Sequence, residues 1–415
     1  MHLERPAQSV TPPGILTILA APILLACLFA IVSPAYAEHI DLNSIDRESP
    51  QFVADQSLLF ATEAGRLDAI KHALEQGADI NARDLRPQHY TALILASRAG
   101  WTQVSEFLIQ SGADVNVRGA DGLSALLFAS NNNMLSLVED LLDSNANPNL
   151  YEPTSGLTPL LLAARNGNQS IIEALLKHET DPNTSESVRG NTPLIEIAAH
   201  RTGLSSVIDL VAAGAEINQT ANDGWSPLMS AIDNGNIRII EFLLLNNAQL
   251  ESETNDGRTA MILAAERNFV TSLEMLIEAN ATINAKSKDG STALGRAAAA
   301  GAEQAVFKLL QANAEIDLSG KDGDPPLLHA ARAGHTQVIQ LLIGQGANVN
   351  AQSTQTGNTA LMLAANLGYA DIVDLLLTAG ADPGIKAKDG WTAEEAARMV
   401  GEMRIIKIIQ DHGKQ

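Results

Sequence analysis

The sequence has 415 residues, of which 46% are hydrophobic but only 4% are aromatic, and its formal net charge is −21. A surface this acidic repels the phosphates of DNA and RNA and the headgroups of anionic lipids. We therefore expect no nucleic-acid partner, and a basic partner would suit the acidic surface better. Alanine and leucine carry most of the apolar content, which favours close helix packing over a β-sandwich.

Residues 1–37 are predicted to be a signal peptide. An uncharged run from Ile15 to Val32 precedes Ala35 and Ala37, whose small side chains fit the pattern that signal peptidase recognises. Cleavage after Ala37 would make Glu38 the new N-terminus and release the chain into the periplasm or outside the cell. Without cleavage, the apolar run would tether the protein to the membrane, and this alternative stays open.

Cys27 is the only cysteine, and it lies inside this leader. Lipidation at Cys27 is disfavoured, because residues 28–32 continue the apolar run where lipoproteins normally turn polar. Cleavage after Ala37 would therefore leave no disulfide and no thiolate metal site, and the mature fold would depend on packing alone.

Residues 38–53 are predicted to be a linker, and residues 54–415 form a repeat domain of about eleven units. Successive copies begin at Thr91, Ser124, Thr158 and Thr192, which are 33 or 34 residues apart. In each copy Thr or Ser can cap a first helix, and proline often occupies the first helical position. Paired alanines such as Ala163-Ala164 would let neighbouring helices approach closely.

The end of the second helix in each copy is almost always Gly or Asn, which tolerate the left-handed backbone conformation that terminates helices. The exception in this column is Glu179, where we expect strain or an altered turn. The column reads Gly77, Gly112, Asn145, Glu179, Gly214, Asn247, Asn280, Asn313, Gly346 and Gly380.

The repeated pattern T-P-L-x-x-A-A-x-x-G, followed by L-L-x-x-G-A-D-V-N, resembles the ankyrin repeat. The resemblance implies an all-α repeat fold, an ankyrin-repeat solenoid of helix–turn–helix units with β-turn fingers between them. Neighbouring units would share one continuous core, because no unit can bury its apolar faces alone. Asn133 and Asn268 depart from the family by replacing the usual glycine between the two helices.

No catalytic motif is present: the chain has no P-loop, no H-E-x-x-H and no G-x-S-x-G. We therefore predict no enzyme activity, no cofactor, no metal site and no small-molecule substrate. His329 and His335 are expected to form hydrogen bonds between repeats. Trp101, Phe269 and Tyr369, at the start of second helices, are expected to wedge between repeats.

Two columns of the repeat face outward and are candidates for contact with a partner. The first column precedes the cap in the finger and supplies three aromatic rings, although each ring could instead shield local apolar surface. The second closes the first helix and supplies arginines, which could instead pair with the chain's own acids. The candidate residues are Tyr90, Trp225, Trp391, Arg98, Arg165 and Arg332.

The sequence therefore predicts an exported, periplasmic scaffold that binds another protein through a rigid, preorganised surface and is itself a monomer. Support of an envelope or periplasmic enzyme is one role that the resemblance implies. The alternatives are a secreted effector that engages host proteins and a membrane-tethered scaffold. Nothing in the residues identifies the partner.

Overall fold

The computed structural model describes residues 49–413, and these residues form 22 helices arranged as eleven consecutive pairs. The described residues divide into two compact units, residues 49–128 and 129–413. The described part of the first unit contains α2 (Pro50–Glu63), α3 (Leu67–Glu75), α4 (Ala92–Ala99) and α5 (Thr102–Gln110), and the division falls within α6 (Ala125–Asn131).

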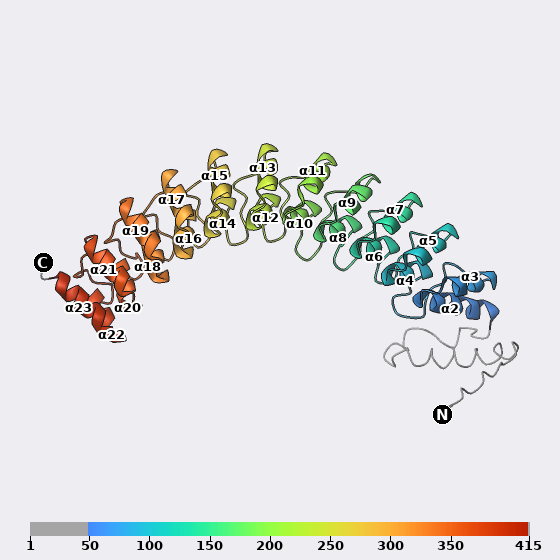
Figure 1. Ribbon diagram of the computed structural model, residues 1–415, viewed down its shortest axis with the longest axis horizontal. Helices are drawn as coiled ribbons and strands as arrows, with labels where there is room; N and C mark the ends of the chain where they lie inside the picture. Colours follow the sequence, from blue (N-terminus) through green and yellow to red (C-terminus); the bar gives the residue numbers. More distant parts are fainter. Residues whose placement is uncertain (1–48, 414–415) are drawn as a thin grey trace, which may run out of the picture. The chain divides into compact units, whose positions relative to one another are not determined.

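The second unit continues the same alternation, and its successive pairs lie side by side (Figure 1). Its even-numbered inner helices lie on the inner side of the arc that this unit follows, and its odd-numbered outer helices on the other side. The helices are α7 (Leu135–Asp143), α8 (Pro159–Arg165), α9 (Gln169–Leu176), α10 (Pro193–Ala198), α11 (Leu204–Ala212), α12 (Pro227–Asp233), α13 (Ile237–Leu245), α14 (Ala260–Glu266), α15 (Val270–Glu278), α16 (Ala293–Ala300), α17 (Glu303–Gln311), α18 (Pro326–Ala333), α19 (Thr336–Gly344), α20 (Ala360–Asn366), α21 (Ala370–Thr378), α22 (Ala393–Val400) and α23 (Met403–His412).

The predicted helix starts are confirmed in most repeats. Thr158 Oγ1 accepts a hydrogen bond from the backbone N–H of Leu161 at 3.2 Å, and Pro159 occupies the first helical position of α8. Thr259 is an exception, because its hydroxyl makes no cap hydrogen bond. Pro325, which takes the cap position of α18, has no side-chain donor or acceptor to offer.

The predicted helix ends are also confirmed, since all ten residues of the Gly/Asn column have positive φ. Glu179 has a φ of 42°, which is the strained left-handed conformation expected for it. In this conformation the Glu179 carbonyl accepts a hydrogen bond from Asn149 Nδ2 at 3.0 Å. Asn149 Oδ1 also accepts from the Asp181 backbone N–H at 2.9 Å, so one asparagine links two repeats.

The wedge residues pack where the sequence placed them. The ring of Trp101 lies against Gly65 of the preceding repeat, and Tyr369 lies against Gly334 in the same way. His335 Nε2 is 3.1 Å from the Ala299 carbonyl oxygen, as expected for a hydrogen bond between repeats. Each of these contacts ties a second helix to the inter-helix turn, or to the end of the first helix, of the repeat before it.

The core runs through the inner helices, which are buried along most of their length. In α8, Leu160, Leu161 and the Ala163-Ala164 pair are completely buried. The adjacent outer helix α9 buries one face only, so its other face remains exposed. The paired alanines thus serve as close contacts between neighbouring inner helices, as their small size predicts.

The first helix begins at Pro50 with Ser49 as its cap, so α2 includes residues 50–53 of the predicted linker. The predicted signal peptide, Cys27 and the cleavage site after Ala37 lie outside the described residues. Between residues 49 and 413, every helix is too short or too polar to cross a membrane.

Candidate functional site

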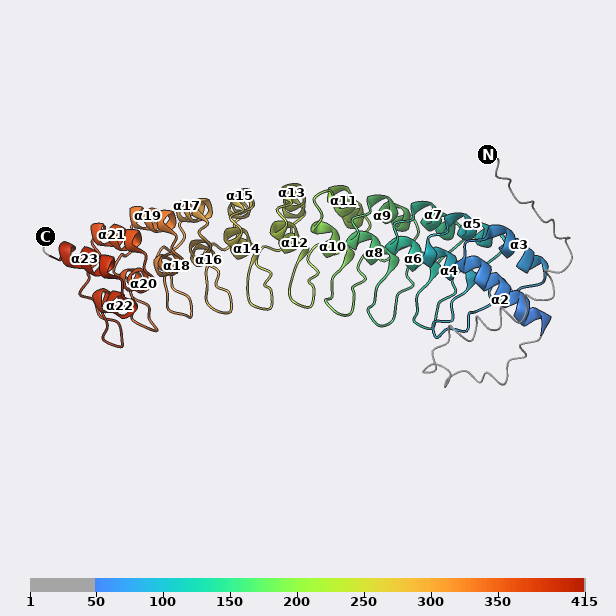
Figure 2. The same cartoon turned by 60° about the horizontal axis from the view of Figure 1, so that its bottom comes forward.

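Between one repeat's outer helix and the next inner helix, the chain forms a finger, and the fingers of the second unit extend to the same side (Figure 2). The finger before α12 shows how the sequence builds them. Asp223 Oδ1 accepts from the Trp225 backbone N–H at 3.2 Å, and Gly224 turns the chain with a φ of 84°. The Asp-Gly pair therefore closes the finger by a local side-chain hydrogen bond and a left-handed glycine.

Neighbouring fingers are joined by backbone hydrogen bonds. The Asn255 N–H donates to the Asp223 carbonyl at 2.7 Å, and the Lys288 N–H donates to Asp256 at 2.9 Å. The same link recurs from Lys321 to Asp289 at 2.9 Å. The finger row is consequently fixed before any partner binds, because each finger is held both by its own turn and by its neighbour.

Tyr90 does not lie exposed on its finger, and the expectation that it offers a ring at the surface is wrong. It is 3% exposed, its hydroxyl donates to Asp121, and its ring meets Phe128 edge-on with centroids 5.8 Å apart. Burial, with the hydrogen bond to Asp121, raises the pKa of Tyr90 well above its usual range. The ring belongs to the local packing of the first unit.

Arg98 lies over this buried ring, with its guanidinium carbon 5.3 Å from the centre of Tyr90. Its Nη2 is also 3.8 Å from a carboxylate oxygen of Glu63. Arg98 therefore takes part in a cation–π contact and an ion pair within the protein itself.

Arg165 at the end of α8 is paired in the same way. Its guanidinium donates to Glu196 on α10 at 2.9 Å and is 4.0 Å from Glu186, a finger carboxylate that is only 6% exposed. The alternative anticipated from the sequence, that these arginines neutralise the chain's own acids, is confirmed for Arg165. The guanidinium still reaches solvent, since 39% of the side chain is exposed.

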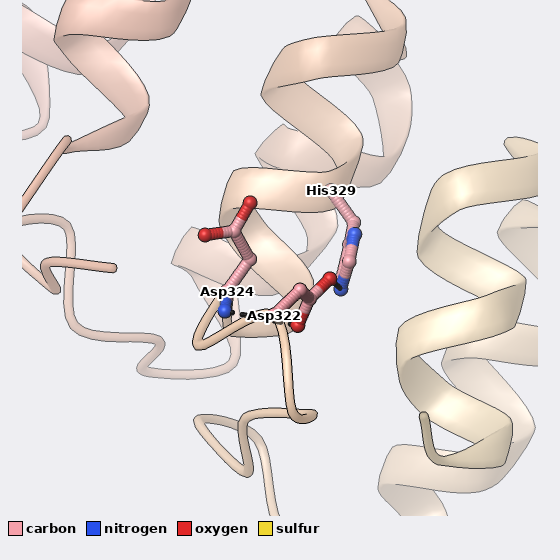
Figure 3. Close-up of side chains that lie close together, drawn as sticks. All are labelled: Asp322, Asp324 and His329. Carbon is pink, nitrogen blue, oxygen red and sulfur yellow. Dashed lines mark hydrogen bonds and ion pairs between the residues drawn. The ribbon is translucent and has the colours of Figure 1, made fainter. Parts of the chain in front are cut away.

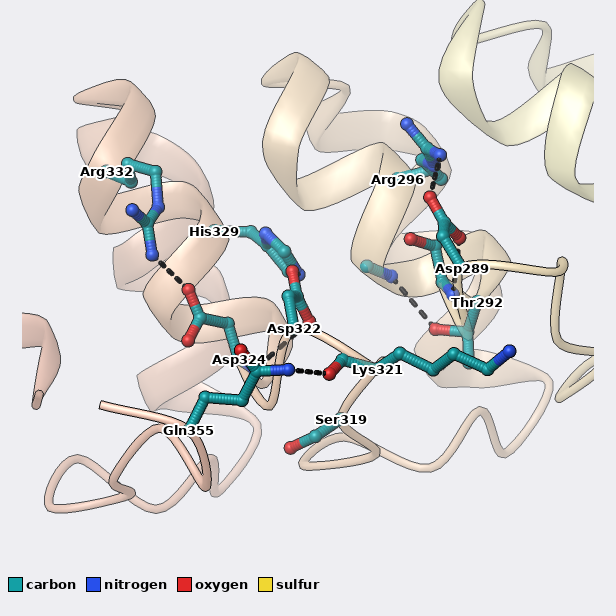
Figure 4. Close-up of polar contacts among 12 residues, drawn as sticks. Asp289, Thr292, Arg296, Ser319, Lys321, Asp322, Asp324, His329, Arg332 and Gln355 are labelled. Carbon is teal, nitrogen blue, oxygen red and sulfur yellow. Dashed lines mark hydrogen bonds and ion pairs between the residues drawn. The ribbon is translucent and has the colours of Figure 1, made fainter. Parts of the chain in front are cut away.

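Arg332 on α18 pairs with Asp324, which is 3% exposed at the base of the preceding finger (Figure 4). His329 from the same helix lies 3.4 Å from Asp322, so this histidine holds its own finger. Among the described residues it does not form the hydrogen bond between repeats that the sequence predicted. Asp322 in turn accepts from the Asp324 N–H at 3.1 Å.

Asp322, Asp324 and His329 are close enough to raise the question of a metal site, with ligand atoms within 4.8 Å of one another. In Figure 3 the Asp322 carboxylate faces His329, whereas the Asp324 carboxylate points away from both. Ligands of a zinc ion lie only about 2 Å from it, so these atoms would have to converge, and Arg332 would have to release Asp324. The geometry fits an ion-paired turn better than a metal centre.

The two finger tryptophans remain accessible. Trp391 is 37% exposed, and Trp225 is half-buried beside its turn. Trp391 borders an open hollow of about 500 Å³ that is lined by Asp389, Gly390, Trp391, Glu395, Arg398 and Met399. Both tryptophans thus keep the exposure that contact with a partner requires.

Sequence reasoning missed several exposed finger side chains. Tyr151 and Val188, at 51% and 72% exposed, lie in the fingers before α8 and α10. It also missed a group of exposed lysines in the fingers near the C-terminus, namely Lys286, Lys288, Lys321, Lys386 and Lys388. The recurring K-D-G of three fingers was the available signal.

The fold is that of a helical repeat protein. Its helices come in pairs whose second helix ends in a left-handed backbone conformation, its inner helices stack on one another, and its fingers are joined by hydrogen bonds. A family model described as ankyrin repeats (three copies) matches residues 58–152, 126–221, 195–289 and 294–387. The chain belongs to the ankyrin-repeat family. No curated protein matches it significantly. Ankyrin repeats mediate binding to other proteins and are generally interaction modules without enzyme activity.

Proposed function

We propose that this protein is exported to the periplasm and binds another protein through its fingers and inner helices. The observation that carries the proposal is the order of that surface. Fingers are joined to one another by backbone hydrogen bonds, and the arginines of the inner helices are held by finger and helix carboxylates. A surface that is already ordered loses little conformational entropy when a partner binds.

Trp225 is the residue in the second unit that best fits a contact with a partner. Its backbone is fixed by Asp223 and by a hydrogen bond from the Ala221 N–H to its carbonyl at 2.9 Å. The side chain is half-buried, so a ring on a fixed backbone keeps apolar surface in reach of solvent. Large aromatic side chains in such positions carry much of the binding energy of protein interfaces.

The candidate arginines pair with the chain's own carboxylates, which is the second of the two roles expected for them. Removing Arg165 would leave Glu186 buried without its counter-ion, which destabilises the finger. An alanine at this position would therefore change the shape of the surface as well as its charge. We propose that Arg98, Arg165 and Arg332 organise the surface and meet a partner only through their exposed edges.

Affinity capture from the source cell's periplasmic fraction tests the binding role. Trp225→Ala should lose a specific partner that the wild-type chain retains. Leu245→Ala is the matched control, because Leu245 is 77% exposed on the outer helix α13 of the same repeat. Equal recovery with the Trp225 variant and the wild type would remove Trp225 from the interface, and recovery of no specific partner by either chain would contradict the proposed function.

Fractionation and N-terminal sequencing test the proposed location. A periplasmic protein that begins at Glu38 agrees with cleavage after Ala37. An intact leader in the membrane fraction would instead support the tethered scaffold, and a cleaved chain in the culture medium would support the effector. Support of an envelope or periplasmic enzyme requires that the captured partner be such an enzyme.

A further inference from the structure

The fingers before α16, α18 and α22 carry a row of exposed lysines in a chain whose net charge is strongly negative. Three of these lysines, Lys288, Lys321 and Lys388, occupy equivalent positions in their fingers. Lys288 and Lys321 are one repeat apart, and Lys321 and Lys388 are two repeats apart. The intervening finger has Thr354 at this position, and its N–H donates to Gly323 at 2.9 Å. We call Lys288, Lys321 and Lys388 the lysine row.

The three side chains leave their fingers in the same direction. Each stem crosses the glycine turn of the preceding finger, so closely that a Cβ added to that glycine would lie 3.0 or 3.1 Å from the lysine Cγ. The pairs are Lys288 over Gly257, Lys321 over Gly290 and Lys388 over Gly357. Figure 4 shows Lys321 extending along the fingertips toward the finger before α16. The stems are therefore placed in advance, which lowers the entropy lost when the ammonium groups bind.

Within the part of the chain that the structure describes, the ammonium groups of the row have no acidic partner. Among residues 49–413, Lys288 Nζ and Lys321 Nζ make no hydrogen bond or ion pair, and Lys388 Nζ donates at 2.6 Å to the Thr354 carbonyl, which is uncharged. By contrast, the arginines of the inner helices are paired with carboxylates. The row thus presents positive charge that the fold leaves available.

The aspartate beside each lysine is engaged in its own finger. Asp289 Oδ1 accepts from the Ser291 N–H at 2.9 Å, and its other oxygen pairs with Arg296. Desolvation raises the pKa of Asp289, but hydrogen bonds from Ser287 and Ser291 and the charge of Arg296 outweigh it and lower the pKa to about 2. Asp322 and Asp389 likewise accept backbone N–H groups of their own turns, from Asp324 at 3.1 Å and from Trp391 at 3.2 Å, so these carboxylates stabilise the turns.

We propose that the lysine row binds an extended, acidic segment of a partner protein. Packed helices are about 10 Å apart, so one repeat corresponds to about three residues of extended chain at roughly 3.3 Å each. Carboxylates at relative positions 1, 4 and 10 would then meet Lys288, Lys321 and Lys388. The hollow beside Trp391 and Met399 follows the row and accepts an apolar side chain of the same segment.

A narrow acidic segment fits this surface better than a membrane or a nucleic acid. At physiological salt, charges interact over about 8 Å, so an extended peptide on the fingertips is affected mainly by the finger residues, where each lysine is followed by an aspartate that its own turn engages. A broad anionic surface would also approach the acidic body of the protein, whose net charge of −21 repels it. The partner recognised here is therefore acidic, although the net charge of the whole chain suits a basic one elsewhere.

The probe is a synthetic peptide of 13 residues with Glu at positions 1, 4 and 10, Leu at position 13, and Gly or Ser elsewhere. It is tested beside its reversed sequence, because the row does not fix the direction of the bound chain. A peptide of the same composition with its three Glu residues adjacent is the control. Binding to the full chain is measured by titration calorimetry. Tryptophan fluorescence is recorded in a parallel titration, and the Trp391→Phe variant shows whether any change in fluorescence comes from Trp391.

The spaced peptide, in one direction, should bind more tightly than the clustered one. Each exposed ion pair changes affinity about two- to fivefold, so the triple variant Lys288→Glu/Lys321→Glu/Lys388→Glu should weaken binding about tenfold to hundredfold. The matched control is Lys71→Glu/Lys177→Glu/Lys407→Glu, which changes the net charge equally at exposed sites outside the fingers and should bind within about twofold of wild type. Circular dichroism checks that both variants fold.

Equal weakening by the two triple variants would overturn the proposal, as would absence of binding by both spaced peptides or equal binding of the clustered one. Binding to vesicles of anionic lipid in place of the peptide would assign the row to a membrane and also overturn it. The proposal rests on the proposed protein-binding function, but the two can fail separately. A captured partner that is lost with Trp225→Ala and kept with the lysine-row variant would refute the acidic segment alone.

Discussion

Replacement of Glu179 by glycine should stabilise the protein. Glu179 closes the outer helix of its repeat with a φ of 42°, a conformation that costs a residue with a Cβ about 1–2 kcal/mol. Glycine removes this strain but loses about 0.5–1 kcal/mol through the greater freedom of the unfolded chain. The net gain is about 0.5–1 kcal/mol, and the hydrogen bond from Asn149 Nδ2 is retained because residue 179 contributes only its backbone carbonyl to it.

The assay is urea unfolding followed by circular dichroism, with the midpoint expected to rise and the slope to stay unchanged. Glu139→Gly is the matched control, since Glu139 is exposed in the middle of α7, where glycine should cost about 1 kcal/mol. Opposite signs for the same substitution would show that backbone conformation decides the outcome. A midpoint that falls for Glu179→Gly as it does for Glu139→Gly would refute the reasoning.

Three further outcomes can be measured by the same unfolding experiment. Gly257→Ala should cost at least about 1 kcal/mol more stability than Gly346→Ala, although both glycines have positive φ. A Cβ at position 257 would lie 2.5 Å from the Lys288 backbone nitrogen, whereas a Cβ at position 346 would meet no atom within 4 Å. Equal costs would refute the close approach at Gly257. Tyr90→Phe should lower the free energy of unfolding by about 1–2 kcal/mol at neutral pH. Because the pKa of Tyr90 is raised in the folded state, wild type should lose this contribution as the pH rises above about 10, whereas the variant has none to lose. Identical alkaline unfolding profiles of the two proteins would contradict this. Hydrogen bonds from Ser155 and Thr154 outweigh desolvation and lower the pKa of Glu152 to about 2. The contribution of Glu152 to folding stability is therefore present above about pH 4.5 and is lost as the pH falls toward 2. Glu152→Gln should reduce this acid sensitivity, and an unchanged acid transition would count against it.

Features that depend on a few neighbouring residues could be predicted from the sequence. The Thr and Pro at helix starts, the Gly and Asn at helix ends and the strain at Glu179 follow from local backbone preferences. The Ser49-Pro50 pair is a start signal of the same kind, and it places residues 50–53 of the predicted linker in α2. Repetition made these signals strong, because each column of the repeat samples one local environment many times.

Features that depend on a neighbouring repeat could not be predicted in the same way. Tyr90 is buried because Asp121 and Phe128, from the next repeat, meet its hydroxyl and its ring. Thr259 shows that even a correct cap residue need not form its bond. The lysines of the row share one direction because each stem crosses a glycine about thirty residues earlier in the chain. Aligning the repeats in the sequence does not reveal this contact between neighbouring repeats.

The most direct test of the central claim is hydrogen exchange of the full chain, measured by mass spectrometry with and without a captured partner. A partner bound to this surface should slow exchange in the fingers and in the first turns of the inner helices, including residues 221–228, and should leave exchange on the exposed faces of the outer helices unchanged. Protection confined to outer helices such as α13 and α15, with the fingers unaffected, would contradict it.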